Sequence, residues 1–221
     1  MGLTNLIKVI YAPGEVFQEE WQKTNFWLSG IIIAVLNGFA VWLSMPVMLE
    51  TTKKMLVDKI PPEQLTVALQ GAKISGLIGA LITPFLIWLL IGLVLSLYSQ
   101  FAGVEGKMGL YLKITILSWV PILLGNIIRS GLIYYLKPEN YLDVKTSLLL
   151  LLPGEVKMDF IHIFMSKLDF FTLWGIVLLG YGYGKAFNTD TKKSIAFWLI
   201  IFILISIISA FFGGQSLQKM A

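Results

Sequence analysis

The chain has 221 residues, of which 57% are hydrophobic and only 14% are charged, and its mean hydropathy is +0.79. These values exclude an ordinary soluble domain and predict that most of the chain lies within a lipid bilayer. The formal net charge of +4 is typical of loop lysines in a membrane protein, so no nucleic-acid partner is expected. The chain contains no cysteine, which excludes disulfides, thiolate metal sites and cysteine nucleophiles.

Residues 1–25 predict an interfacial amphipathic arm. Apolar residues recur at helical spacing from Leu3 to Ile10, and Pro13 interrupts the helix that they predict. A second short helix is expected after this break. Two interpretations are open: the arm anchors the protein to the lipid surface, which we favour, or it docks a partner.

The remainder, residues 26–217, predicts a single transmembrane domain. The expected fold class is an all-α polytopic membrane protein with five transmembrane helices, an interfacial N-terminal helix and helical loop segments. Three uncharged stretches reach the roughly 20 residues that a helix needs to cross a bilayer, and the third span reaches this length only with Arg129 included. The fourth stretch in chain order is shorter, and it crosses only if it includes Asp169 or thins the bilayer. The predicted spans cover about 26–48, 74–102, 110–136, 168–186 and 194–216.

Small residues recur on one face of each of the first two spans, which favours close approach of neighbouring helix backbones. Two prolines predict kinks, Pro84 in the second span and Pro121 in the third. Residues 50–71, between the first two spans, are typical of a polar connection with one or two helical turns. The small residues expected to pack helices are Gly30, Ala34, Ala72, Gly76 and Ala80.

The third span carries the only arginine of the chain, Arg129. The uncharged runs on either side are each too short to cross alone, so one helix is expected to hold Arg129 at membrane depth. Asn126 shares its side of the helical wheel, which predicts a polar stripe facing other helices. An unpaired charge at this depth costs roughly 2.5–3.5 kcal/mol on insertion scales. We therefore predict that Arg129 pairs with Asp169, supported by Asn126; the alternative is that both charges reach the headgroups separately.

Other polar residues are expected to have structural roles. Asn37 lies near the middle of the first span, where an interhelical hydrogen bond is favoured over contact with a ligand. His162, the only histidine, lies in an apolar stretch, which favours a structural residue over a ligand or a proton relay. Its neighbour Asp159 gives a weak indication of an enzyme that acts on lipid.

The sequence contains no catalytic, cofactor-binding or metal-binding motif. Residues 180–185, GYGYGK, lack the spacing and the hydroxyl residue of a phosphate-binding loop, so these glycines predict packing at a helix end. A single histidine cannot form a two-histidine metal site. The sequence PGEV occurs at 13–16 and at 153–156, but the flanking residues differ, which favours coincidence over an inverted repeat. The chain is therefore not expected to be an enzyme.

The lysines in the short turns at 105–113 and 185–193 favour a cytoplasmic N-terminus. Five spans then place the C-terminus outside. The expected location is the plasma (inner) membrane.

Three stretches resemble the Yip family, the Ypt/Rab-interacting membrane proteins with five spans, and in particular its bacterial branch. They are 12–17 (APGEVF), 106–121 (GKMGLYLK leading to SWVP) and 168–180 (LDFFTLW continuing through Gly180). The resemblance implies the same orientation and a scaffold or accessory role. In eukaryotic relatives that role concerns membrane traffic with small GTPases, and in bacteria it includes assistance to ABC-type export systems. The short segment before Trp27 disfavours the GTPase role, and the family supplies no catalytic residues.

We therefore expect a non-enzymatic scaffold or accessory protein that contacts the lipid bilayer and either other membrane proteins, such as export-system subunits, or itself. The alternative is a small-solute channel or transporter, in which the stripe around Asn126 and Arg129 lines a path. A water-filled cavity that reaches Arg129 favours the channel. An Arg129 closed off by Asp169 favours the scaffold.

Overall fold

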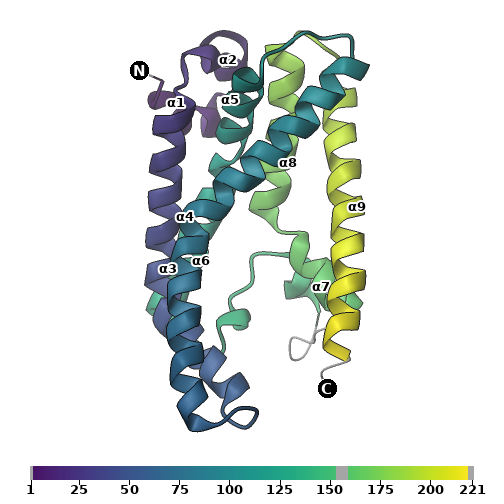
Figure 1. Cartoon of the computed structure of the whole chain (residues 1–221). Helices are drawn as coiled ribbons and strands as arrows, with labels where there is room; N and C mark the ends of the chain where they lie inside the picture. The colour runs from purple at the N-terminus through teal and green to yellow at the C-terminus, as the bar shows by residue number, and fades with distance from the viewer. Residues whose placement is uncertain (1, 153–158, 219–221) are drawn as a thin grey trace.

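The computed structural model of the protein describes residues 2–152 and 159–218, so the second PGEV sequence lies outside the described residues. The described chain is a bundle of helices without β-strands (Figure 1). Its elements are α1 (Thr4–Tyr11), α2 (Pro13–Glu15), the π-helical η1 (Val16–Glu20), the 3-10 segments η2 (Trp21–Lys23), η3 (Tyr141–Asp143) and η4 (Leu148–Leu151), α3 (Phe26–Leu56), α4 (Pro62–Phe101), α5 (Met108–Ser118), α6 (Val120–Leu136), α7 (Phe160–Lys167), α8 (Phe170–Ala186) and α9 (Thr191–Gln218).

Four helical segments of the described chain are long and apolar enough to cross a membrane: Phe26–Leu56, Pro62–Phe101, Met108–Leu136 and Thr191–Gly213. The predicted all-α membrane fold is therefore confirmed. Helix α8 has 17 residues and is about 25 Å long, somewhat less than the roughly 30 Å of a bilayer core. The fifth span stays a prediction.

The first two long helices extend beyond the predicted spans. Helix α3 continues through Pro46 to Leu56, and α4 already begins at Pro62. The predicted polar connection over 50–71 is therefore wrong, and residues 57–61 alone join the two helices. Charged residues end an apolar span but not a helix, because a helix that leaves the bilayer keeps its internal hydrogen bonds in water. Pro62 fits the first turn of α4, where its missing N–H leaves no bond unmade.

The predicted single helix over 110–136 is divided at Trp119 into α5 and α6. Pro121 explains the division, because it has no N–H and its ring would clash with the carbonyl of Leu117 in a continuous helix. Helix α4, by contrast, continues through Pro84. The two prolines therefore act differently, although the sequence predicts a kink at each.

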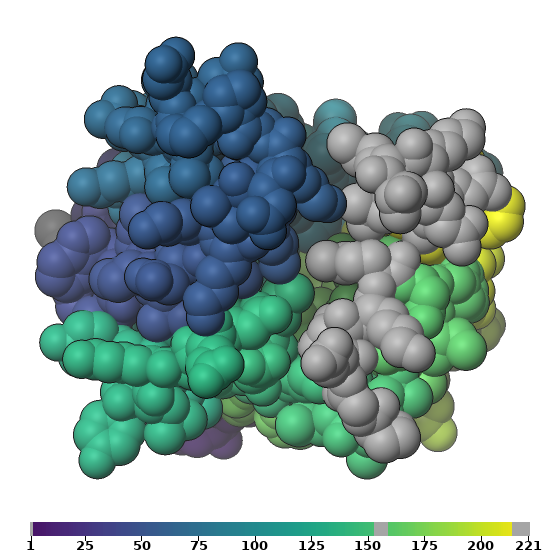
Figure 2. Space-filling view, turned by 90° about the horizontal axis from the view of Figure 1, so that it is seen from below, coloured from purple at the N-terminus to yellow at the C-terminus, as the bar shows by residue number. Residues whose placement is uncertain are grey.

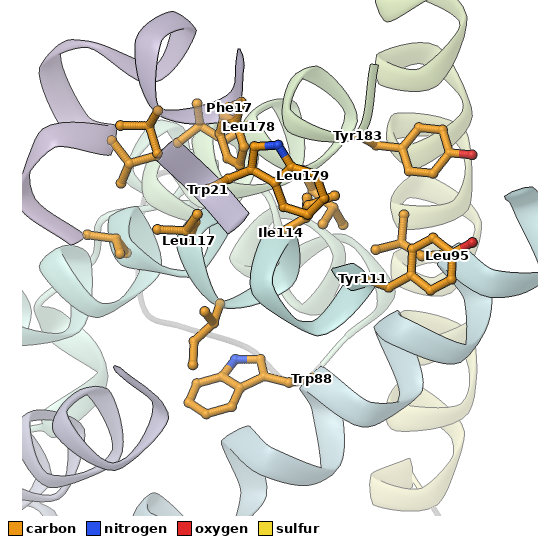
Figure 3. Close-up of a cluster of buried hydrophobic side chains, with 14 of the residues drawn as sticks. Phe17, Trp21, Trp88, Leu95, Tyr111, Ile114, Leu117, Leu178, Leu179 and Tyr183 are labelled. Atoms are coloured by element: carbon orange, nitrogen blue, oxygen red, sulfur yellow. The ribbon is translucent and has the colours of Figure 1, made fainter. Parts of the chain in front are cut away.

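The N-terminal segment folds over one end of the bundle, where Figure 1 places α1 and α2 beside α5. Its helix breaks at Pro13 as predicted. The part after Pro13 packs into the bundle, because Val16, Phe17 and Trp21 are at most 2% exposed, whereas Ile7 and Tyr11 of α1 are 68% and 73% exposed. The interfacial role of the arm stays a prediction. Figure 3 shows Phe17 and Trp21 near Leu178 and Leu179 of α8. The part of the segment after Pro13 therefore belongs to the hydrophobic core.

Polar contacts hold this segment to itself. The Lys8 ammonium lies 2.9 Å from the Glu15 carboxylate and 2.8 Å from that of Glu20. The hydrogen bond from Lys8 lowers the pKa of Glu20, and the two carboxylates raise the pKa of Lys8. The buried Asn5 amide donates to the Glu20 carbonyl oxygen at 2.9 Å and to Thr24 Oγ1 at 3.2 Å. These contacts hold α1 against the residues that follow Pro13.

Helices α8 and α9 approach each other through glycines. A Cβ atom at Gly180 would lie 2.5 Å from Ile195 Cα, and one at Gly184 would lie 2.6 Å from Thr191 Cα. Backbones this close leave no room for any side chain. On another face of α8, a Cβ at Gly182 would lie 2.6 Å from Phe17 Cε1. These glycines pack helices against neighbouring parts of the protein.

We predict that Gly180→Ala destabilises the protein by about 1–3 kcal/mol, because the added methyl group overlaps the backbone of α9. Gly79→Ala is the matched control: its Cβ would meet only Thr83 Oγ1, at 3.9 Å, and should leave stability nearly unchanged. Unfolding of both variants in the same detergent measures the difference. Equal stability of the two variants would contradict the close packing of α8 on α9.

Candidate functional site

A polar cavity of about 350 Å³ lies between α6 and the start of α8, near α7 and away from the N-terminal segment. The loop after α6 and the end of α7 complete its walls. Figure 2 looks onto this end of the molecule, where the loop after α6 lies beside the end of α3. The side chains in its lining that bear on its chemistry are Asn126, Arg129, Lys145, Lys167, Asp169 and Thr172.

The loop is held by pairing with the chain before α8. Ser147 and Asp169 form an isolated antiparallel bridge, and the Leu148 N–H donates to the Leu168 carbonyl oxygen at 3.0 Å. Leu149 is buried at 6% exposure and anchors the loop in the protein. The leucine run 148–152 forms only the short 3-10 turn η4. Pro153 disfavours a helical backbone at Leu152, which is extended, so the turn does not continue as a helix.

The loop also holds Arg129. Arg129 Nε donates to the Val144 carbonyl oxygen at 2.9 Å, and the guanidinium carbon lies 4.6 Å from the centre of the Tyr141 ring. Within the described residues, the two terminal amino groups of Arg129 have no protein acceptor. The guanidinium is therefore fixed in place while most of its donors remain available.

The predicted ion pair between Arg129 and Asp169 is wrong: no such pair forms among the described residues, although both side chains line the cavity. Asp169 caps α8, with its Oδ1 accepting from the Thr172 N–H at 3.0 Å and from the Thr172 hydroxyl at 3.3 Å. The start of a helix favours a carboxylate, and a carbonyl with an aromatic face favours a guanidinium. Each charge thus has its own local partner.

The two asparagines join three helices. Asn126 Nδ2 donates to Asn37 Oδ1 at 3.0 Å, and Asn37 Nδ2 donates to the Ala80 carbonyl oxygen of α4 at 2.9 Å. Asn37 therefore makes interhelical hydrogen bonds. The sequence predicts that Asn126 supports an Arg129–Asp169 pair, but in the structure Asn126 donates to Asn37 instead. These bonds satisfy polar groups at a depth where lipid offers no partner.

The predicted small-residue stripes pack the bundle itself. A Cβ at Gly30 would lie 3.0 Å from Phe85, and one at Gly76 would lie 3.5 Å from Met48. Ala34 and Ala80 are buried at 4% and 9% exposure, and Ala72 is half-buried.

A further stripe, which the sequence reading missed, lies on the outer face of α4. It consists of Gly71, Ser75, Gly79 and Thr83, of which Gly79 is half-buried and the other three are exposed. We call it the outer stripe. No part of the described chain lies within 4 Å of a Cβ placed at Gly71.

His162 and Asp159 lie at the start of α7. Asp159 Oδ1 accepts from the His162 backbone N–H at 2.9 Å and lies 2.8 Å from His162 Nδ1. The backbone hydrogen bond lowers the pKa of Asp159. These contacts cap the start of α7.

The cavity ends within the bundle. Ile122 lines the cavity and also borders a void of about 20 Å³ beside Ser118 and Gly175. This void has room for about one water molecule. Beyond it is the hydrophobic core, where Trp88, Tyr111 and Tyr183 are at most 1% exposed (Figure 3). The polar space is therefore closed toward the N-terminal segment.

Comparison with protein families shows that the model of the Yip1 domain matches residues 7–213. Comparisons with characterised proteins and with solved structures gave no match.

A pair of double-mutant cycles tests the polar contacts. We predict that Arg129→Ala and Asp169→Ala change stability independently, with a coupling energy below about 0.5 kcal/mol. Asn37→Ala and Asn126→Ala should couple by about 0.6–1.7 kcal/mol, because they share one interhelical hydrogen bond. Unfolding in detergent measures both cycles. A coupling energy between Arg129 and Asp169 as large as that between the two asparagines would show that the ion pair forms and would contradict the structure.

Proposed function

The chain belongs to the Yip1 domain family, and on that premise we propose that it is a non-enzymatic scaffold or accessory protein of the membrane. It acts by contact with other membrane proteins, and the subunits of an ABC-type exporter are the partners that we propose. The family model extends over the long apolar helices, so the membrane domain itself is the functional unit in this proposal.

The outer stripe of α4 is the observation that carries the proposal. Its small residues recur every four positions, and Ile78 and Ile82 beside it are 51% and 52% exposed. In a bilayer, such spacing allows a second helix to approach closely and gain van der Waals contact. The other small-residue stripes are already covered by the protein's own side chains. Among the small-residue stripes of the described chain, the outer stripe alone is therefore free to contact a helix of a partner protein.

We further propose that the N-terminus is cytoplasmic and the C-terminus outside, in the plasma (inner) membrane of a bacterium, with α8 as the fifth span. Figure 1 supports an odd number of spans, because α1 and the far end of α9 lie at opposite ends of the bundle. The end of α8, with Lys185, and the start of α9, with Lys192 and Lys193, lie at the same end of the bundle as α1, which supports the cytoplasmic assignment.

A channel or transporter is the second candidate, favoured by the cavity that reaches Arg129 without closure by Asp169. Transport requires continuity to the opposite face. That continuity would need separation of buried aromatic residues such as Trp88 and Tyr183, both at 0% exposure. The accessory role requires no such rearrangement, and we place it first.

The test is crosslinking in native membranes followed by purification in mild detergent and mass spectrometry. We predict that the wild-type protein retains at least one other membrane protein in stoichiometric amount. Gly79→Leu should lower that recovery about tenfold, because its side chain fills the groove that the partner helix occupies. Ile78→Leu, a neighbouring exposed change that keeps apolar volume, is the control and should retain the partner.

Two results contradict the proposal. Recovery of the wild-type protein alone would exclude the accessory role. Equal recovery with Gly79→Leu and Ile78→Leu would exclude the outer stripe as the contact surface.

A further inference from the structure

The lining of the polar cavity is rich in cations. Arg129, Lys145 and Lys167 face it together with one carboxylate, Asp169. Neither lysine forms an ion pair in the described part of the chain, and Asp169 already caps α8. The excess of positive charge among the described lining residues favours an anion.

Arg129 is prepared to receive that anion. Its Nε bond to Val144 and its place over Tyr141 fix the plane of the guanidinium, so little side-chain entropy is lost on binding. The unused terminal amino groups form a planar fork, the geometry that binds phosphate oxygens in pairs. The hydroxyls of Thr146 and Ser147 in the lining also have no partner among the described residues. They provide further donors beside the fork.

The depth of the cavity suits an anion carried at the membrane surface. Arg129 lies seven residues before the end of α6 at Leu136, which is about 10 Å along the helix. Leu150 and Leu151, in the wall loop, are 64% and 75% exposed, and Phe170 is 62% exposed. Apolar surface thus borders the polar cavity, as a site at headgroup level requires.

The geometry points to a binding site for a phosphate group in this cavity, held by Arg129 with Lys145 and Lys167. The phosphate belongs either to a lipid headgroup or to a soluble molecule, and both sources present the same oxygens to the guanidinium. This site is independent of the outer stripe and of the accessory role.

The experiment uses the full-length protein, freed of lipid in detergent, with thermal stability and native mass spectrometry as readouts. The probes are short-chain phosphatidylglycerol, diacylglycerol with the same acyl chains, glycerol 3-phosphate and inorganic phosphate. We expect phosphatidylglycerol to bind and stabilise the protein and diacylglycerol to do neither. Competition by glycerol 3-phosphate or inorganic phosphate would identify a soluble source; absence of competition would identify a lipid headgroup.

Variants assign the site. Arg129→Gln should weaken phosphate-dependent binding about tenfold or more, since it removes charge-assisted hydrogen bonds. Lys192→Gln removes one positive charge at the exposed start of α9 and is the control, with unchanged binding expected. The double variant Lys145→Gln with Lys167→Gln leaves the Arg129 contacts intact and tests the site even where Arg129→Gln does not fold.

Three results would overturn the inference. The first is equal binding of phosphatidylglycerol and diacylglycerol. The second is binding of none of the phosphate probes. The third is phosphate-dependent binding that neither the Arg129 variant nor the double lysine variant weakens.

Discussion

The contact of Phe17 with Gly182 is the interaction on which the arrangement of this molecule depends. It brings the N-terminal segment onto α8, which is itself held to α9 through Gly180 and Gly184. Phe17 belongs to one core of buried side chains, which also contains Tyr111 and Tyr183, and this core closes one end of the bundle. At the other end, a loop spans the space between α6 and α8, and a polar cavity remains. The molecule therefore has one closed end and one hollow end.

Polar groups inside an apolar bundle are costly unless they find partners, and the described structure supplies them from different elements. The asparagines use a neighbouring helix, Asp169 uses the start of its own helix, and Arg129 uses a loop. Because Arg129 and Asp169 are satisfied separately, the cavity keeps charges that are not neutralised by each other. This separation is what makes the cavity suitable for a charged ligand.

Composition and length were sufficient to predict the all-α membrane fold, and the rarity of arginine in a span directed attention to Arg129, which lines the polar cavity. The prediction of the ion pair was wrong because Arg129 contacts a loop instead. That loop is held by the bridge between Ser147 and Asp169, a non-local contact that no local pattern indicates. Burial of Phe17 was missed for the same reason, since its partner Gly182 lies far away in the chain. The outer stripe escaped notice because α4 was expected to begin at residue 74, which left Gly71 in a loop.

The claim of one closed and one hollow end is tested most directly by thiol accessibility, since the chain has no cysteine of its own. Single cysteines at Thr172, in the cavity, and at Ser118, on its closed side, are exposed to a membrane-impermeant thiol reagent from each face. Lys59→Cys and Glu105→Cys mark the two faces. The structure predicts that Thr172→Cys reacts only from the Lys59 face and that Ser118→Cys reacts from neither. Labelling of Ser118→Cys, or of Thr172→Cys from the Glu105 face, would contradict the account.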